Sequence, residues 1–167
     1  SSLPLVEIVS GCEVASFGTA DEAVQARAAD GSVHEAAMLI GADGIWSAIR
    51  RQLWPAAELT YSGKTAARAV IDRHAAPAPF RDMATGVWLS HGGHVVHYPV
   101  RGGAEIALVV IIKEDWPGEG WGLPVDRRAL LEKLQPFSSR LTDFLALADD
   151  WRRWPLYDPA PLECWSQ

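Results

Sequence analysis

The sequence predicts an α+β fold: a mixed, largely antiparallel sheet with helices on one face. Three observations lead to this prediction. Strand-like runs separated by glycine turns make up most of the chain, and apolar residues take helical spacing only in three short stretches, with no internal repeat. The resulting order is strands, one helix, strands, two helices and a last strand. That order is typical of helices layered on one face of a sheet.

The first 40 residues predict a small antiparallel meander. A short β-branched run covers residues 5–9, and strand-like segments follow at residues 14–17, 24–29 and 33–37. Asp30-Gly31 separates the last two segments, and Asp-Gly between alternating segments is a strong hairpin signal. The meander leads into the next stretch of the chain.

That stretch, residues 38–50, predicts a short buried strand, a tight turn and a helix. Met38-Leu39-Ile40 is apolar, Asp43-Gly44 favours a bend, and helical spacing starts at Ile45. Pro55 ends the helix. A carboxylate and a glycine at a helix N-terminus suit a ribose or a phosphate, but a purely structural turn is an equally good interpretation of these residues alone.

The middle of the chain predicts a second meander. Its strands are expected at 65–71, 86–90, 94–100 and 105–112, with glycine turns at 91–93 and 101–103 and a proline-containing loop at 72–81. Residues 113–124 hold several glycines and prolines and predict a loop.

Two helices and a strand complete the prediction. Asp126 caps the first helix, which Pro136 ends, and Ser138 or Ser139 caps the second, which finishes near Asp149-Asp150. The last strand covers residues 151–157, and residues 158–161 are extended.

Composition excludes several classes of partner. The net charge of −6 argues against nucleic acid or an anionic membrane, because both require a basic surface. No apolar run has the length of a membrane span. The two cysteines, Cys12 and Cys164, lack metal spacing and are typical of a reducing compartment, so we expect a cytoplasmic protein.

The sequence gives only weak evidence for a metal site, a catalytic serine or a phosphate-binding loop. His91, His94 and His97 are spaced by three, but His94 and His97 point to opposite faces of a strand, so we predict no metal site. No serine lies in a nucleophile elbow, and the chain has no glycine-rich phosphate loop. The eight tryptophans suit core packing or, alternatively, an aromatic pocket for a flat ligand.

The segment from Gly41 to Arg50, GADGIWSAIR, resembles the Asp-Gly motif of the FAD-dependent aromatic hydroxylases, the salicylate hydroxylase-like monooxygenases. Three later segments extend the resemblance in the same order. They are Tyr61-Ser62-Gly63 with Arg68, the run from His94 to Gly103, and the run from Trp154 to Asp158 followed by Pro161-Leu162 and Trp165. One difference is Pro159, where close relatives often carry arginine.

The resemblance implies a fragment of a longer hydroxylase that uses FAD and NAD(P)H on a small aromatic substrate. Residues 1–55 would be part of the FAD domain, 56–157 the substrate domain and 158–167 the return. Asp43, Gly44 and Arg50 would lie near the cofactor, and Trp88, Ser90, His97 and Tyr98 would line the substrate pocket. The N-terminal GxGxxG and C-terminal Gly-Asp motifs of the family are absent, so we expect a middle fragment, inactive by itself.

Two other interpretations stay open. The chain can be a non-catalytic α+β domain that binds a small molecule or a partner. Exposed sheet edges can also drive formation of a homodimer.

Overall fold

The computed structural model describes residues 5–116, 120–135 and 137–166. Contacts divide these residues into two compact units, one made of 5–60 with 159–166 and the other of 61–158. The chain crosses from one unit to the other near the start of β4 (Leu59–Asp72) and near the end of β9 (Arg152–Pro159). Each unit is described by itself.

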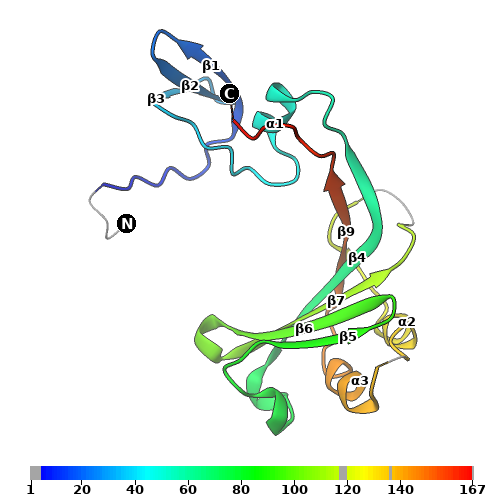
Figure 1. The fold of residues 1–167 in the computed structure, drawn as a ribbon. Helices are drawn as coiled ribbons and strands as arrows, with labels where there is room; N and C mark the ends of the chain where they lie inside the picture. The colour runs from blue at the N-terminus through cyan, green and yellow to red at the C-terminus, as the bar shows by residue number, and fades with distance from the viewer. Residues whose placement is uncertain (1–4, 117–119, 136, 167) are drawn as a thin grey trace. The chain divides into compact units, whose positions relative to one another are not determined.

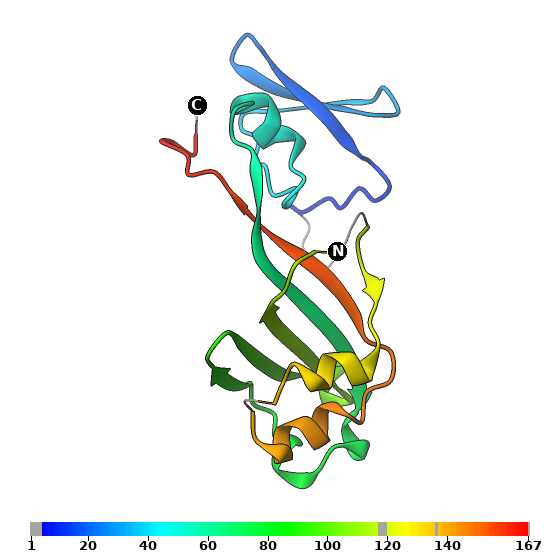
Figure 2. The ribbon, with the colours of Figure 1, turned by 90° about the vertical axis from the view of Figure 1, so that its right-hand side faces the viewer.

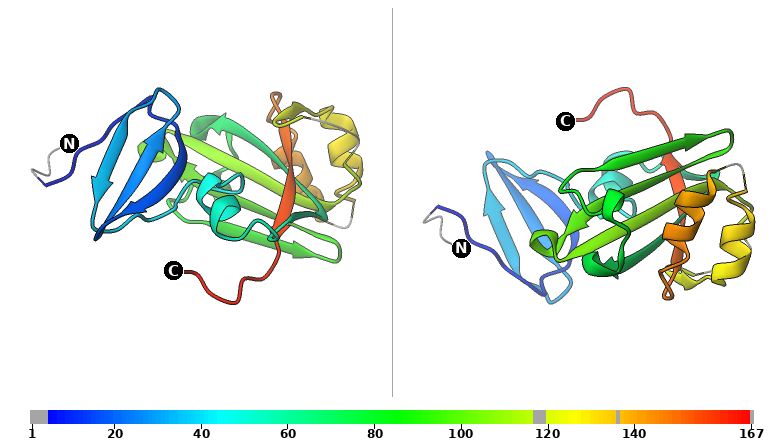
Figure 3. Two further views of the ribbon diagram at one scale, coloured as in Figure 1. Left: turned by 90° about the horizontal axis from the view of Figure 1, so that it is seen from above. Right: turned by 90° about the horizontal axis from the view of Figure 1, so that it is seen from below.

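The first unit holds a three-stranded antiparallel sheet in the order β1-β2-β3, drawn in blue in Figure 3. Its strands are β1 (Val14–Ala20), β2 (Ala23–Ala28) and β3 (Val33–Ala36). Gly31 takes a φ of 89° in the turn between β2 and β3, a conformation that glycine adopts without strain. The structure therefore confirms the predicted meander, although the run at residues 5–9 forms no strand.

The predicted buried strand at Met38–Ile40 is wrong. Met38 is 70% exposed and Ile40 is 74% exposed, and among the described residues no strand pairs with this segment. A strand requires hydrogen bonds from a neighbour, so an apolar run without one stays irregular. The helix also starts later than predicted: α1 spans Ala48–Leu53.

The second unit is built on a six-stranded sheet in the order β5-β6-β7-β4-β9-β8. Its remaining strands are β5 (Gly86–Ser90), β6 (Gly93–Val100), β7 (Glu105–Lys113) and β8 (Leu123–Pro124). The β5–β6, β6–β7, β7–β4 and β8–β9 pairs are antiparallel. Figure 1 shows that β4 and β9 also run in opposite directions. Short 3₁₀ turns at Arg73–Ala75, Ala78–Phe80 and Arg101–Gly103 complete the connections.

Two helices cover one face of this sheet, as Figures 1 and 2 show. Helix α2 (Arg127–Glu132) begins where the Asp126 carboxylate accepts the Ala129 N–H at 2.8 Å, which confirms the predicted cap. Helix α3 (Ser139–Leu145) ends four residues before Asp149. The Asp149 carboxylate forms an ion pair with Arg127 at the start of α2. The predicted stop at Pro136 lies outside the described residues.

The main core lies between the sheet and these helices. Strand residues alternate, so Ala67, Val95 and Val110 face the helices while Arg68, Val96 and Val109 face the other way. We call the first surface the helix face and the second the opposite face. On the helix face the core contains the buried side chains of Leu108, Leu134, Leu141, Phe144, Leu145 and Trp151. The predicted α+β class with helices on one face is confirmed. No helix in the described ranges is long and apolar enough to cross a bilayer.

Candidate functional site

The Asp43-Gly44 turn is held by the Asp43 carboxylate. One carboxylate oxygen accepts the Ser47 hydroxyl at 2.5 Å, and the other accepts the backbone N–H groups of Ala48 at 2.7 Å and Ile49 at 3.2 Å. Ser47 is the N-cap of α1, and its hydroxyl oxygen accepts the Arg50 N–H at 2.9 Å. Asp43 and Ser47 together satisfy the first free amides of the helix, which is why α1 begins at Ala48 rather than at Ile45.

Electrostatics favour an ionised Asp43. Partial burial raises the pKa of this carboxyl, but the hydrogen bonds from Ser47, Ile49 and Ala48 outweigh burial and hold it below its ordinary value of 3.8. The carboxylate keeps acceptor capacity beyond these three bonds, because two oxygens offer about four lone-pair positions.

Gly44 and Arg50 complete the turn. Gly44 has a φ of 77°, and apart from its two chain neighbours no atom of the described residues lies within 4 Å of the place where a side chain would begin. A ligand can therefore approach the Gly44 backbone closely. The Arg50 guanidinium donates to the carbonyl oxygens of Gly44, at 3.5 Å, and of Ile45, while its Nε is buried and has no hydrogen-bond partner among the described residues. The three residues predicted to lie near the cofactor thus lie together.

Three of the four predicted pocket residues lie toward the helix face. The Trp88 indole N–H donates to His97 Nδ1 at 3.2 Å, and both rings pack near Phe80. Phe80 in turn stacks on Phe144 of α3 with ring centres 3.9 Å apart. His97 is 7% exposed, and burial lowers its pKa below 6.5, so its imidazole is neutral at neutral pH. Ser90 follows Trp88 by two positions on β5 and points the same way.

The fourth residue, Tyr98, lies on the opposite face. In the strand register it is level with Ala107 on β7 and with Val70 on β4, which is 54% exposed. Arg68 shares this face, and its guanidinium lies 5.6 Å from the centre of the Trp154 ring. The predicted four residues therefore do not converge, and their contact with a substrate stays a prediction.

The histidines do not converge either. His94 is paired with Leu89 and His97 with Gly86, so the two imidazoles leave β6 on different sides. Within the described residues, no group of three His, Cys, Asp or Glu side chains is placed to hold a metal ion.

The segments that form these features also occur in known enzymes. No protein-family model matches the chain. The chain is 33% identical over 161 residues to 3-hydroxybenzoate 6-hydroxylase 1 of Aquipseudomonas alcaligenes, an alignment that covers 96% of this chain and 41% of that enzyme. The chain is homologous to a segment of the FAD-dependent aromatic hydroxylases.

A second relative is also an aromatic hydroxylase. The chain is 30% identical over 146 residues to a 3-amino-4-hydroxybenzoate 2-monooxygenase of Streptomyces platensis, an alignment that covers 87% of this chain and 37% of that enzyme. The chain thus spans about two fifths of the length of these curated relatives.

Solved structures share the fold of the aromatic hydroxylase segment. A salicylate hydroxylase substrate complex superimposes with a TM-score of 0.72 at 25% identity, covering 97% of this chain and 44% of that one. HpxO of Klebsiella pneumoniae, complexed with FAD and uric acid, gives a TM-score of 0.66 at 20% identity over 94% of this chain and 40% of that one, which bears on the fold alone.

Sequence reasoning missed one residue of the hydroxylase Asp-Gly turn. The sequence motif gives Ser47 no separate role, yet its 6% exposed side chain connects Asp43 to the Arg50 backbone. Its position four residues after Asp43 and three before Arg50 is the signal that identifies it, because a serine three residues before an amide is typical of an N-cap.

Proposed function

We propose that this chain is the part of an FAD-dependent aromatic monooxygenase that carries the Asp-Gly turn and the sheet against which the substrate binds. The observation that carries the proposal is the homology across 96% of the chain to 3-hydroxybenzoate 6-hydroxylase 1, together with a formed Asp43-Gly44 turn. In this proposal residues 1–55 and 158–167 contribute to a flavin domain, and residues 56–157 form the substrate domain.

The turn residues fit a flavin nucleotide. The open space at Gly44 admits a close ligand, the Asp43 carboxylate has acceptor capacity for sugar hydroxyls, and Arg50 adds a positive charge beside the turn. FAD, when bound, supplies the oxygen-activating chemistry, for which NAD(P)H provides the electrons. The role of Asp43, Gly44 and Arg50 is to hold the cofactor in a fixed position.

The substrate in this proposal is a small aromatic compound, held flat and away from water. Tyr98 lies on the opposite face of the sheet and is the pocket residue best placed to touch it. Trp88, Ser90 and His97 lie on the helix face, on the other side of the sheet from Tyr98, and the Trp88–His97 hydrogen bond holds β5 and β6 together there. In this proposal they support the substrate-binding sheet rather than touch the substrate.

A chimera tests the proposal. Residues 1–167 replace the matching segment of 3-hydroxybenzoate 6-hydroxylase 1, and the purified chimera is assayed for bound flavin and for NAD(P)H oxidation stimulated by a panel of hydroxybenzoates. We expect bound flavin and a hydroxylated product. An Asp43→Asn chimera should lose flavin, whereas Glu22→Gln, a change at an exposed turn, should retain it. A folded chimera that holds flavin but hydroxylates none of the panel would argue for a non-catalytic binding domain.

The chain by itself gives a second test. We expect no tight FAD binding and no turnover by the 167-residue chain, because it spans about two fifths of the length of its relatives. FAD fluorescence is followed while the chain is added. A yellow purified chain with stoichiometric flavin would contradict this expectation.

A further inference from the structure

A cysteine, a histidine and an aspartate lie together beside the β2–β3 hairpin of the first unit. Cys12 lies two residues before β1, and its Sγ is 3.7 Å from Nε2 of His34 on β3. A thiol is a weak hydrogen-bond donor and a neutral imidazole nitrogen is an acceptor, so the thiol proton can point at Nε2. Both cysteines are free thiols, and among the described residues Cys12 is the one that has a histidine within this distance.

Backbone pairing keeps the cysteine beside the histidine. The carbonyl oxygen of Glu13 accepts the Ala29 N–H at 2.8 Å, which joins the segment around Cys12 to the end of β2. His34 is paired with Ala26 in the register of β2 and β3. The sulfur and the imidazole are therefore brought together by main-chain hydrogen bonds of one small sheet.

Asp30, in the turn between β2 and β3, adds a negative charge near His34. Its carboxylate accepts the Ser32 hydroxyl at 2.7 Å and the Ser32 N–H at 2.9 Å. These two bonds hold the pKa of the Asp30 carboxyl below 3.8, and the attraction of His34 acts in the same direction. Because the attraction is mutual, an ionised Asp30 also stabilises the imidazolium that forms when His34 takes up a proton.

This arrangement suits a nucleophilic thiol. The thiolate is the form of cysteine that attacks, and an imidazole within reach activates it by accepting the thiol proton. An acidic group beside the imidazole favours that proton transfer. In the described part of the chain these three side chains are not placed to hold a metal ion together.

We propose that Cys12 is a modification site for small disulfides, with His34 as the base that receives its proton. Cys12 Sγ attacks one sulfur of the disulfide, a new S–S bond forms, and the outer sulfur leaves as a thiolate with the electron pair of the broken bond. The Cys12 proton moves to His34 Nε2. Cys12 is oxidised and the leaving sulfur is reduced, so the disulfide is the only oxidant required. The proposal is independent of the proposed monooxygenase activity.

The test compares two single-cysteine chains, Cys164→Ser and Cys12→Ser, with 4,4′-dithiodipyridine at neutral pH. Released thiopyridone absorbance gives the rate, and intact mass confirms one mixed disulfide per chain. Exposure alone predicts that Cys164, which is exposed, reacts faster than the partly buried Cys12. We expect the reverse order, with Cys12 at least about threefold faster, because it has a base within reach. An equal or slower rate at Cys12 would overturn the proposal.

Variants of the histidine identify the base. In the Cys164→Ser chain, His34→Gln should slow modification of Cys12 at least about threefold, and the exposed position of His34 makes this change compatible with folding. His91→Gln, at the exposed turn between β5 and β6, is the matched control and should leave the rate unchanged. An unchanged rate in His34→Gln would refute the role of the imidazole.

The same rates measured in concentrated urea show whether the fold is responsible. Unfolding separates Cys12 from His34, so we expect the two single-cysteine chains to react at similar rates there. An advantage of Cys12 that persists in urea would assign it to neighbouring residues in the sequence and would also overturn the proposal.

Discussion

At the scale of single residues, Asp43 stabilises the start of α1, a role that the sequence motif alone does not indicate. Its carboxylate completes the N-terminus of α1 through Ser47, Ala48 and Ile49. A carboxylate that already holds its own turn is pre-oriented, so a ligand would bind it without further ordering of the side chain. The conformation of the turn and the binding of a ligand therefore both depend on the Asp43 carboxylate.

We expect Asp43→Asn to destabilise the first unit by about 1 kcal/mol, because an amide nitrogen cannot accept the N–H groups that a carboxylate oxygen accepts. Hydrogen exchange at the Ala48 and Ile49 amides measures the effect. Glu22→Gln, at the exposed turn between β1 and β2, is the control and should leave exchange unchanged. Equal exchange in the two variants would mean that Asp43 is not the cap.

His97 should make the second unit sensitive to acid. Its pKa is lowered by burial, so between this pKa and the ordinary 6.5 the unfolded chain binds a proton that the folded unit does not. The free energy of unfolding is therefore full above about pH 6.5 and falls as the pH drops through this window. Protonation of Nδ1 would also break the bond from Trp88.

Urea unfolding at a series of pH values, followed by tryptophan fluorescence, checks this expectation. His97→Gln keeps an acceptor for Trp88 and should remove this part of the pH dependence. His94→Gln, on the other side of β6, should retain it. A pH dependence unchanged in His97→Gln would assign the effect to other groups.

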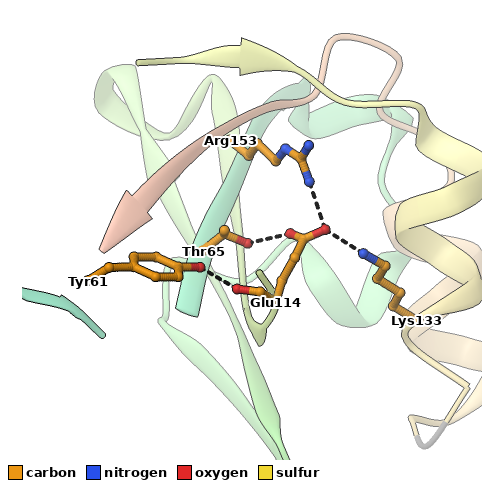
Figure 4. A network of polar contacts seen from close by, with 5 residues as sticks. All are labelled: Tyr61, Thr65, Glu114, Lys133 and Arg153. Carbon is orange, nitrogen blue, oxygen red and sulfur yellow. Dashed lines mark hydrogen bonds and ion pairs between the residues drawn. The ribbon is translucent and has the colours of Figure 1, made fainter. Parts of the chain in front are cut away.

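At the scale of elements, Glu114 joins three segments distant in the sequence. Its partners come from β4, from β9 and from the residue that ends α2, as Figure 4 shows. Removing the charge leaves Arg153 partly buried beside an uncharged group. We expect Glu114→Gln to lower the free energy of unfolding by about 1–3 kcal/mol. The range allows for the Lys133–Glu114 pair, which contributes less because solvent screens the exposed Lys133.

Urea unfolding of the second unit measures this loss. Glu132→Gln is the matched control, because Glu132 makes an exposed ion pair with Arg128 one turn away on α2. Its effect should stay below about 0.5 kcal/mol. A loss in Glu114→Gln no larger than in the control would show that the network adds little to stability.

Close packing of β5 on β6 depends on Gly86. A Cβ on this residue would lie 1.9 Å from His97 Cε1. Gly86→Ala should therefore displace the buried imidazole and cost about 1–3 kcal/mol. In Gly18→Ala the new methyl group meets no atom of the described residues within 4 Å, apart from its chain neighbours, so we expect no loss. Thermal unfolding of the two variants compares them, and equal melting temperatures would contradict the contact.

At the scale of the whole molecule, the two units differ in their cores. All the residues of the main core, from Ala67 to Trp151, lie in the unit of residues 61–158. The first unit buries few apolar side chains, among them Ala26, Ala28 and Ile49, and leaves Met38 and Ile40 exposed. Stability rises with the apolar area buried, so the units should differ in stability.

We expect residues 61–158 to fold alone, and limited proteolysis of the chain to cleave first within residues 5–60. Mass spectrometry of the resistant fragment and the NMR amide dispersion of an isolated 61–158 polypeptide test this. First cleavage inside the six-stranded sheet, or an unfolded 61–158 polypeptide, would show that the first unit stabilises the second.

The sequence by itself determined the local elements and the family. The three-strand meander, β5, the cap at Asp126 and the Asp43-Gly44 turn follow from turn chemistry and short-range periodicity, which act within a few residues. Ser138 takes the N-cap position of α3, but its side chain makes no capping hydrogen bond. The 33% identity to 3-hydroxybenzoate 6-hydroxylase 1 confirms the resemblance to the aromatic hydroxylases that four sequence segments indicated.

Only the tertiary structure decided which side chains meet. Alternation puts the neighbours His97 and Tyr98 on opposite faces of their strand, but it cannot say which face the helices cover. Only the structure showed that His97 lies with Trp88 on the helix face and Tyr98 on the opposite face. The sequence also could not show that Met38–Ile40 lacks a pairing strand within the described part of the chain. Nor could it show that Glu114, Thr65 and Arg153 converge across 88 positions of chain, from 65 to 153. Such contacts depend on strand order and register, which are set by the packing of the whole sheet rather than by any local segment.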